Sequence, residues 1–121
     1  MSAPAVGPYT PVVRAGDWVV VSGQLGLSGG QLVAGGVAEQ LAQALANLFA
    51  RLSEEGAGPS DVVKTTVFMT DIADYVEMNR AYVASFGDHR PARSAVAVAA
   101  LPLGARVEVE AWAYKPVTWT S

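Results

Sequence analysis

Hydrophobic positions recur along this chain at two periods, and each period predicts a different kind of element. Between Val37 and Gly56 leucines recur every three or four residues, at Leu41, Leu45, Leu48 and Leu52. This spacing places them on one face of an α-helix, and Gly56 is a suitable end. A second helix is predicted to start at Asp71 or Asp74 and to end at Gly87. Its large side chains share one stripe: Tyr75, Met78, Tyr82 and Phe86.

Runs rich in β-branched residues predict the strands. Gly16–Gly23 and Asp61–Asp71 are two such runs. The glycine-rich stretch "LGLSGGQLVAGG" between the first strand and the first helix predicts a turn or a short hairpin. Two more strands, "ARSAVAVAAL" and "ARVEVEAWAYK", close the chain, and we expect a tight turn at "PLG" to join them as a hairpin.

This order of elements predicts an α+β fold in one domain over residues 1–121. A single antiparallel or mixed sheet with two helices packed on one face fits the order best. Along Val96–Ala100 both alternate sets of side chains are Ala or Val, so neither face of that strand favours water. We therefore expect the uncovered face to meet another copy of the chain. The alternative is a sheet left half-exposed with small side chains.

Charge and composition remove several classes of function. Eight basic and eleven acidic residues give a net charge of −3, which argues against binding to nucleic acid or to anionic membranes. The absence of cysteine excludes disulfides and thiolate catalysis. We see no signal peptide, no membrane-spanning apolar run, no metal-ligand cluster and no nucleotide-binding glycine motif. We expect a cytoplasmic protein without a metal site.

The segment "RPARSAVAVAALP" places one guanidinium, that of Arg93, at the start of an otherwise small and apolar run. Arginine stays charged at physiological pH, and its planar fork suits a carboxylate that is bound through both oxygens. Arg93 is therefore a candidate for binding a substrate carboxylate. An ion pair with Asp88, or with a glutamate from elsewhere, is the structural alternative.

The last strand alternates cleanly and places two carboxylates, Glu108 and Glu110, on one face. Such a pair can tune each other's pKa for acid–base chemistry, or can simply line a solvated or oligomeric surface. In the predicted hairpin, Glu108 lies opposite Val98 or Ala99, which puts it roughly 17–20 Å from Arg93. If both residues are functional, we expect them to meet across a subunit boundary.

Three further sequence features point more weakly to candidate site residues. Tyr9 in "GPY" is an aromatic hydroxyl near the start of the chain, and Ser22 and Gly23 in "SGQ" end a predicted strand. Gly23 permits close approach of a ligand to the backbone, although a bulge explains it equally well. The single histidine, His89, is read as a loop residue rather than a base.

Four segments together resemble the RidA family, also called the YjgF/YER057c/UK114 family. They are "GPYTPVVRAGDWVVVSGQL", "VAEQLAQALANL", "DVVKTTVFMTDIADYVEMNRAYVASFG" and "RPARSAVAVAALPLGARVEVEA". The resemblance implies a chorismate-mutase-like fold that assembles as a homotrimer with sites between subunits. It implies hydrolysis of reactive enamines and imines, such as 2-aminoacrylate, to 2-keto acids and ammonia without a cofactor. A non-catalytic module that binds small acids in the same clefts is the alternative.

The same resemblance implies roles for individual residues. Arg93 is expected to bind the substrate carboxylate and Glu108 to position the attacking water. Tyr9, Ser22, Gly23 and Asn79 are expected to contact substrate. Ala95 stands where many members have cysteine, so it is expected to line the pocket without a thiol. Other departures are Ala97, in place of a common glutamate, and a short loop before Arg93.

Overall fold

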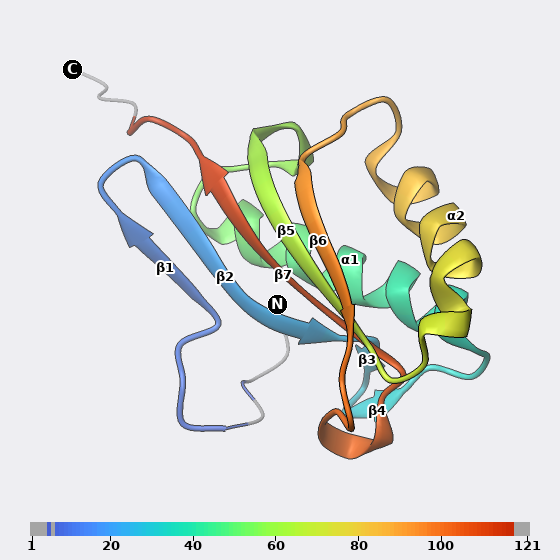
Figure 1. The fold of residues 1–121 in the computed structure, drawn as a ribbon. Helices are drawn as coiled ribbons and strands as arrows, with labels where there is room; N and C mark the ends of the chain where they lie inside the picture. Colours follow the sequence, from blue (N-terminus) through green and yellow to red (C-terminus); the bar gives the residue numbers. More distant parts are fainter. Residues whose placement is uncertain (1–4, 6, 118–121) are drawn as a thin grey trace.

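The computed structural model describes residue 5 and residues 7–117. The described chain contains nine helices and strands joined by short turns (Figure 1). These are β1 (Val12–Ala15), β2 (Trp18–Leu25), β3 (Leu27–Ser28), β4 (Gln31–Leu32), α1 (Val37–Glu54), β5 (Val62–Met69), α2 (Tyr75–Phe86), β6 (Ala92–Ala97) and β7 (Val107–Tyr114). Three 3₁₀ turns lie at Pro59–Asp61, Ile72–Asp74 and Pro102–Gly104. The short β3–β4 pair confirms the predicted glycine-rich hairpin.

Local capping sets where the helices begin and end. The Glu39 carboxylate accepts a hydrogen bond from the backbone N–H of Gly36 at 2.8 Å, and this contact stabilises the first turn of α1. Asp71 accepts from the N–H of Ala73 at 2.9 Å and starts the 3₁₀ turn that leads into α2. The helix ends at Gly87, whose φ of 65° suits glycine. Both predicted helices are therefore confirmed to within two residues.

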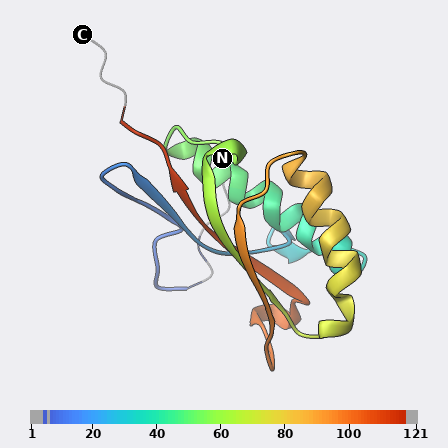
Figure 2. The same cartoon turned by 45° about the horizontal axis from the view of Figure 1, so that its top comes forward.

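The five main strands form one sheet in the order β1-β2-β7-β5-β6. Only β5 and β6 run parallel, and the other neighbours are antiparallel. Both helices cover the same face of this sheet, as the two views in Figure 1 and Figure 2 show. The predicted α+β architecture, a mixed sheet with two helices on one face, is confirmed.

The predicted hairpin between the last two strands is wrong. β6 pairs with β5, and β7 pairs with the opposite edge of β5, so the last two strands are not neighbours. The physical reason is the helix between β5 and β6: a strand–helix–strand crossover places the second strand parallel to the first and beside it. The segment Pro102–Gly104 is a 3₁₀ turn, and β6 already ends at Ala97.

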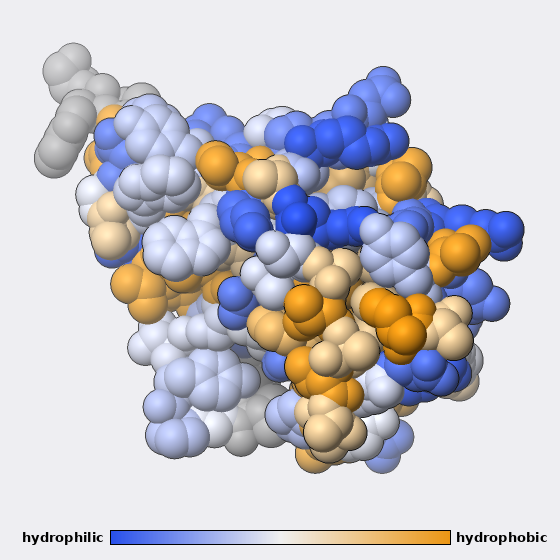
Figure 3. Space-filling view, viewed as in Figure 1, coloured by the Kyte–Doolittle hydropathy of each residue, from blue (hydrophilic) through white to orange (hydrophobic). Residues whose placement is uncertain are grey.

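The core lies between the helices and one face of the sheet. Side chains of β7 alternate as predicted, and four of them are fully buried against the helices: Val107, Val109, Ala111 and Ala113. The opposite face, called the open face below, carries exposed Trp18, Trp112 and Val96. Figure 3 looks onto this face. No helix of the described residues is long and apolar enough to cross a membrane.

Candidate active site

A cleft of about 430 Å³ lies on the open face where β2 and β7 meet the N-terminal segment. It contains four of the predicted site residues: Tyr9, Ser22, Gly23 and Glu108. Apolar side chains, including Leu25 and Phe68, form much of the remaining wall. The structure thus brings these four residues together in one cleft, although they come from three separate segments of the chain.

Gly23 is required here by the side chain of Glu108. The pairing of β2 with β7 is interrupted between Val21 and Gln24, so β2 bulges at this point. A Cβ atom built on Gly23 would lie 2.7 Å from the carboxyl carbon of Glu108. The absence of a side chain therefore allows the Glu108 carboxylate to lie directly against the backbone of β2.

Two features of its surroundings act on the pKa of Glu108 in the same direction. Burial raises the pKa of the Glu108 carboxyl above its ordinary value, and the nearby negative charge of Glu110 raises the pKa further. No hydrogen-bond donor from the described part of the chain reaches the Glu108 carboxylate. A carboxylate with a raised pKa and free oxygen atoms is suited to hold a water molecule and accept its proton.

The N-terminal segment is attached to the cleft through Ser22. The Ser22 hydroxyl donates to the carbonyl oxygen of Thr10 at 2.8 Å, and the Ser22 N–H donates to that of Pro11 at 2.9 Å. These two bonds hold the segment that carries Tyr9 beside the cleft. Ser22 therefore anchors the N-terminal segment, in addition to its predicted contact with substrate.

Arg93 lies on the other side of the sheet, facing α2. Its Nη2 donates to the hydroxyl of Tyr75 at 3.1 Å, and its Nη1 approaches the sulfur of Met78 at 3.7 Å. The guanidinium carbon lies 4.8 Å from the ring centroid of Tyr82, within the range of a cation–π contact. These contacts from one helix fix the plane of the guanidinium.

The charge of Arg93 has no partner within the described residues. Their ion pairs are Arg14–Glu55, Arg51–Glu54 and Arg106–Asp74. The expected structural alternative, an ion pair of Arg93 with Asp88 or a glutamate, is therefore not formed there. A half-buried guanidinium held by aromatic rings and lacking a carboxylate is the arrangement expected of a site for an anionic ligand.

Tyr82 supports Arg93 from the core. Its hydroxyl shares a 2.7 Å hydrogen bond with that of Thr65, which is fully buried on β5. Burial raises the pKa of the Tyr82 phenol, although the bond to Thr65 and the charge of Arg93 act in the opposite direction. The phenol thus stays neutral and serves as a flat support for the guanidinium.

The remaining predicted residues are placed as follows. Asn79 lies on the adjacent stripe of α2, in a hollow it shares with Val76 and Val83. Its Oδ1 is buried without a hydrogen-bond partner from the described residues. Ala95 lies two residues beyond Arg93 and packs on the core. His89 contacts the carbonyl oxygen of Val62 at 2.7 Å through Nε2, which fits the predicted loop role.

The predicted site residues therefore form two groups on opposite faces of one sheet. Arg93 pairs with Thr65, whose side chain faces the helices, whereas Glu108 pairs with Phe68, whose side chain lines the cleft on the open face. Three residues along β5 and two strand spacings separate their Cα atoms by about 14 Å. This replaces the 17–20 Å of the incorrect hairpin, and the two side chains also point apart.

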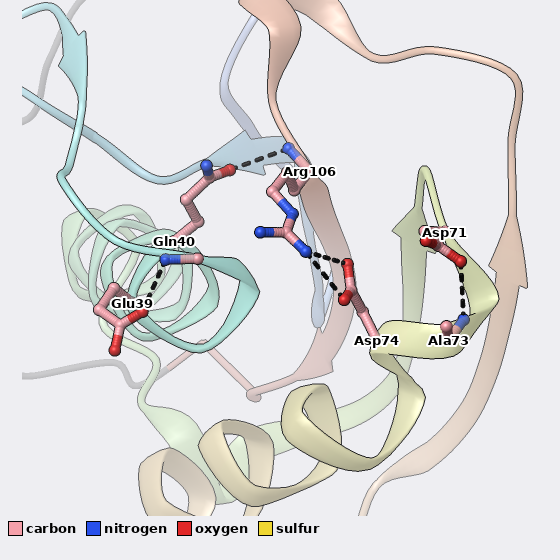
Figure 4. Close-up of polar contacts among 7 residues, drawn as sticks. Glu39, Gln40, Asp71, Ala73, Asp74 and Arg106 are labelled. Carbon is pink, nitrogen blue, oxygen red and sulfur yellow. Dashed lines mark hydrogen bonds and ion pairs between the residues drawn. The ribbon is translucent and has the colours of Figure 1, made fainter.

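An ion pair fixes the start of α2 relative to the strand that bears Glu108. Nη2 of Arg106, at the start of β7, contacts both carboxylate oxygens of Asp74 at 2.9 Å (Figure 4). The backbone N–H of Arg106 also donates to the buried Gln40 side chain at 2.9 Å. The first turns of both helices are thereby connected to β7.

Sequence reasoning missed the roles of Tyr75 and Tyr82. It placed both on the apolar stripe of the second helix, where Met78 and Phe86 are indeed core residues. The sequence signal for these roles was the seven-residue spacing of Tyr75 and Tyr82, which places both rings on the stripe of α2 that faces β6. No group of three His, Cys, Asp or Glu side chains in the described residues is arranged to hold a metal ion.

Comparison with known proteins places this chain among relatives of similar length. The sequence model of the family described as "Endoribonuclease L-PSP" matches residues 1–115. Human 2-iminobutanoate/2-iminopropanoate deaminase is 46% identical over 120 residues, which cover 97% of this chain and 88% of the human one. The chain belongs to the RidA family.

Solved structures of other RidA-family proteins agree with the fold. RidA from an Antarctic Psychrobacter bacterium is 39% identical with a TM-score of 0.89, and the match covers 93% of each chain. A protein of Thermotoga maritima described as a putative endoribonuclease is 43% identical with a TM-score of 0.90, covering 96% of this chain and 93% of that one. The family resemblance of the sequence motifs is thus confirmed over nearly the whole length.

Proposed function

We propose that this RidA-family protein hydrolyses reactive 2-imino acids and their enamine tautomers to 2-keto acids and ammonia, at sites formed by two chains. One observation carries the proposal. Among the described residues, the Arg93 guanidinium forms no ion pair and the Glu108 carboxylate accepts no hydrogen bond, and the two groups lie on opposite faces of the sheet. A second copy is needed to bring the two groups to one substrate.

The surfaces of the chain support an assembly of copies. β6 is an edge strand, and one of its backbone edges has no neighbour in the sheet. The open face carries the exposed side chains of Trp18 and Trp112, packed edge to face at 6.2 Å, and exposed Val96. We propose a homotrimer, the assembly implied by the RidA resemblance, in which the Arg93 edge of one chain meets the Glu108 cleft of the next.

The first step of the proposed reaction is binding of the carboxylate. Arg93 accepts the substrate carboxylate on its free N–H groups, and the fixed charge holds the adjacent imine carbon in one position. An enamine such as 2-aminoacrylate takes a proton on its terminal carbon and becomes the iminium ion. The apolar wall of the cleft, including Leu25 and Phe68, receives the substrate side chain.

The second step is addition of water. Glu108 takes a proton from a water molecule as its oxygen bonds to the imine carbon, and the electron pair of the C=N bond moves to nitrogen. Glu108 then returns the proton to that nitrogen. As the C–N bond breaks, Glu108 takes the proton of the carbinolamine hydroxyl, the C–O bond becomes a carbonyl, and this proton passes to the departing ammonia. The proton that the enamine takes up comes from solvent and leaves with the ammonium ion, so atoms and charge balance with water as the only other reactant.

Two other functions are less well supported. The described lining of the cleft includes two carboxylates, Glu108 and Glu110, and no cation, which disfavours the phosphate backbone that an endoribonuclease must bind. A module that only binds small acids would need the carboxylate contact of Arg93. It would not need a carboxylate with a raised pKa in the same site.

A coupled assay tests the proposal directly. Imines are generated in place from several amino acids by an enzyme that releases them, and keto-acid formation is followed with and without this protein. We expect the protein to accelerate keto-acid release well above the rate in water. Binding of keto acids without any acceleration would instead establish the binding module.

A further inference from the structure

The hydroxyl of Tyr75 is placed to be a second donor for the substrate carboxylate. Tyr75 is the first residue of α2, and the residue is 40% exposed. Its oxygen accepts a hydrogen bond from Nη2 of Arg93 at 3.1 Å. Because the guanidinium donates to this oxygen, the phenolic proton must point elsewhere, and no acceptor in the described residues takes it.

The geometry of Arg93 leaves room for a shared ligand. A guanidinium has five N–H groups, and the contacts to Tyr75 and Met78 occupy one on each terminal nitrogen. A carboxylate with one oxygen on the remaining N–H of Nη2 can turn its other oxygen toward the Tyr75 hydroxyl, because the two N–H groups of Nη2 diverge and the hydroxyl already lies on one of them. We propose that Tyr75 binds substrate, donating its O–H to one carboxylate oxygen while Arg93 donates to the other. This inference rests on the proposed function.

Tyr75 is held firmly enough for this role. Its backbone N–H donates to the carbonyl oxygen of Ile72, and the preceding residue, Asp74, is held by Arg106 through the contacts at 2.9 Å. Tyr82, the other ring against Arg93, cannot take this role because its hydroxyl is bonded to Thr65 inside the core. Of the two described phenols that contact Arg93, Tyr82 is buried and Tyr75 is the one exposed to a ligand.

The expected consequence is selectivity for ionised acids over neutral analogues. A hydrogen bond to a charged group contributes more than one to a neutral group. Loss of the Tyr75 hydroxyl should therefore weaken binding of a keto acid by about 10-fold or more, and should weaken binding of the matching amide by less than about 3-fold. Loss of packing at Tyr75 would affect both ligands equally.

The experiment compares Tyr75→Phe with the wild-type protein in the intact assembly. Dissociation constants for 2-oxobutanoate and for 2-oxobutanamide are measured by NMR titration. Tyr75→Phe removes the hydroxyl and its bond to Nη2 of Arg93 but keeps the ring, whose centroid lies 5.6 Å from the guanidinium carbon, and a thermal melt checks that the fold is preserved. Tyr114→Phe is the matched control because its hydroxyl contacts Asp17 at 3.4 Å, away from Arg93.

Each outcome decides the proposal. Weaker binding of the acid alone in Tyr75→Phe supports a direct contact with the carboxylate. Unchanged acid affinity, or equal weakening of acid and amide, overturns it. Failure of the proposed function is seen separately: wild-type protein that binds 2-oxobutanoate but accelerates no imine hydrolysis leaves the Tyr75 comparison valid. If the wild type binds neither ligand, the carboxylate site at Arg93 and Tyr75 is refuted.

Discussion

Arg93 and Glu108 occupy opposite faces of one sheet, although their strands, β6 and β7, both pair with β5. Arg93 is opposite Thr65 and points toward the helices, and Glu108 is opposite Phe68 and points into the cleft on the open face. No rotation of either side chain can bring the two groups to one small molecule through the sheet. The proposed function therefore requires that each chain contribute Arg93 to one site and Glu108 to another.

Replacing Arg93 by lysine is expected to be nearly as damaging as replacing it by alanine. Lysine keeps the charge but lacks the planar set of donors that can contact Tyr75 and a carboxylate together, and it loses the flat contact with the Tyr82 ring at 4.8 Å. Both variants should lower kcat/KM for imine hydrolysis by roughly 100-fold. Steady-state kinetics at several substrate concentrations provide the comparison. Wild-type activity in the lysine variant would show that charge alone is sufficient.

Removing the charge of Glu110 is expected to shift the pH dependence of activity. The Glu110 carboxylate contributes to the raised pKa of Glu108, so Glu110→Gln lowers that pKa. Glu108 must be ionised to accept a proton, and activity falls as pH drops through its pKa. The acid limb of the kcat/KM profile should therefore move to lower pH in Glu110→Gln. Glu77→Gln, which removes an equal charge from exposed α2, should leave the limb in place.

A single methyl group at position 23 is expected to impair catalysis more than stability. In Gly23→Ala the new Cβ would lie 2.7 Å from the Glu108 carboxyl group, which must move aside. Since small displacements of a reacting group are costly, kcat should fall by about 10-fold or more while Tm changes little. Gly58→Ala is the control, because the nearest atom to a Cβ there is 4.0 Å away. Equal kcat in both variants would argue against this position for Glu108.

The sequence predicted where the helices and strands lie more reliably than which strands pair in the sheet. Leucine spacing located α1, and the alternation along β7 identified its buried face, because both patterns record local contact with one core. The strand that pairs with β6 is set by contacts between segments far apart in the sequence. The tight turn suggested by Pro102–Gly104 favoured a hairpin, yet the crossover through α2 placed β6 beside β5. The strand β1 was not predicted because its four residues precede Gly16 without a break in composition.

The sequence named candidate site residues but did not reveal how they are arranged. The roles that the family resemblance implies for Arg93 and Glu108 stay predictions; the structure adds that neither group is neutralised by an ion pair among the described residues. The support from Tyr75 and Tyr82 was missed, since a stripe of large side chains on a helix looks the same whether it packs on a core or holds a cation. The division of the site between two faces required the sheet order, which no local pattern contains.

Subunit complementation tests the central claim, that Arg93 of one chain and Glu108 of another form each site. Inactive Arg93→Ala chains and inactive Glu108→Gln chains are mixed in equal amounts, dissociated and reassembled. Light scattering confirms that the wild type and the mixture form trimers, and wild-type chains carried through the same treatment must regain activity. In a closed ring, a boundary is intact only when one side keeps Arg93 and the other keeps Glu108.

The expected result follows from counting the boundaries. With random assembly each of the two sides is intact with a chance of one half, so activity should return to about a quarter of that of reassembled wild type. Sites built within one chain could not be restored by any mixture. Recovery to about a quarter is expected if each site is shared by two chains, and mixed trimers that remain inactive beside an active wild-type control would exclude shared sites.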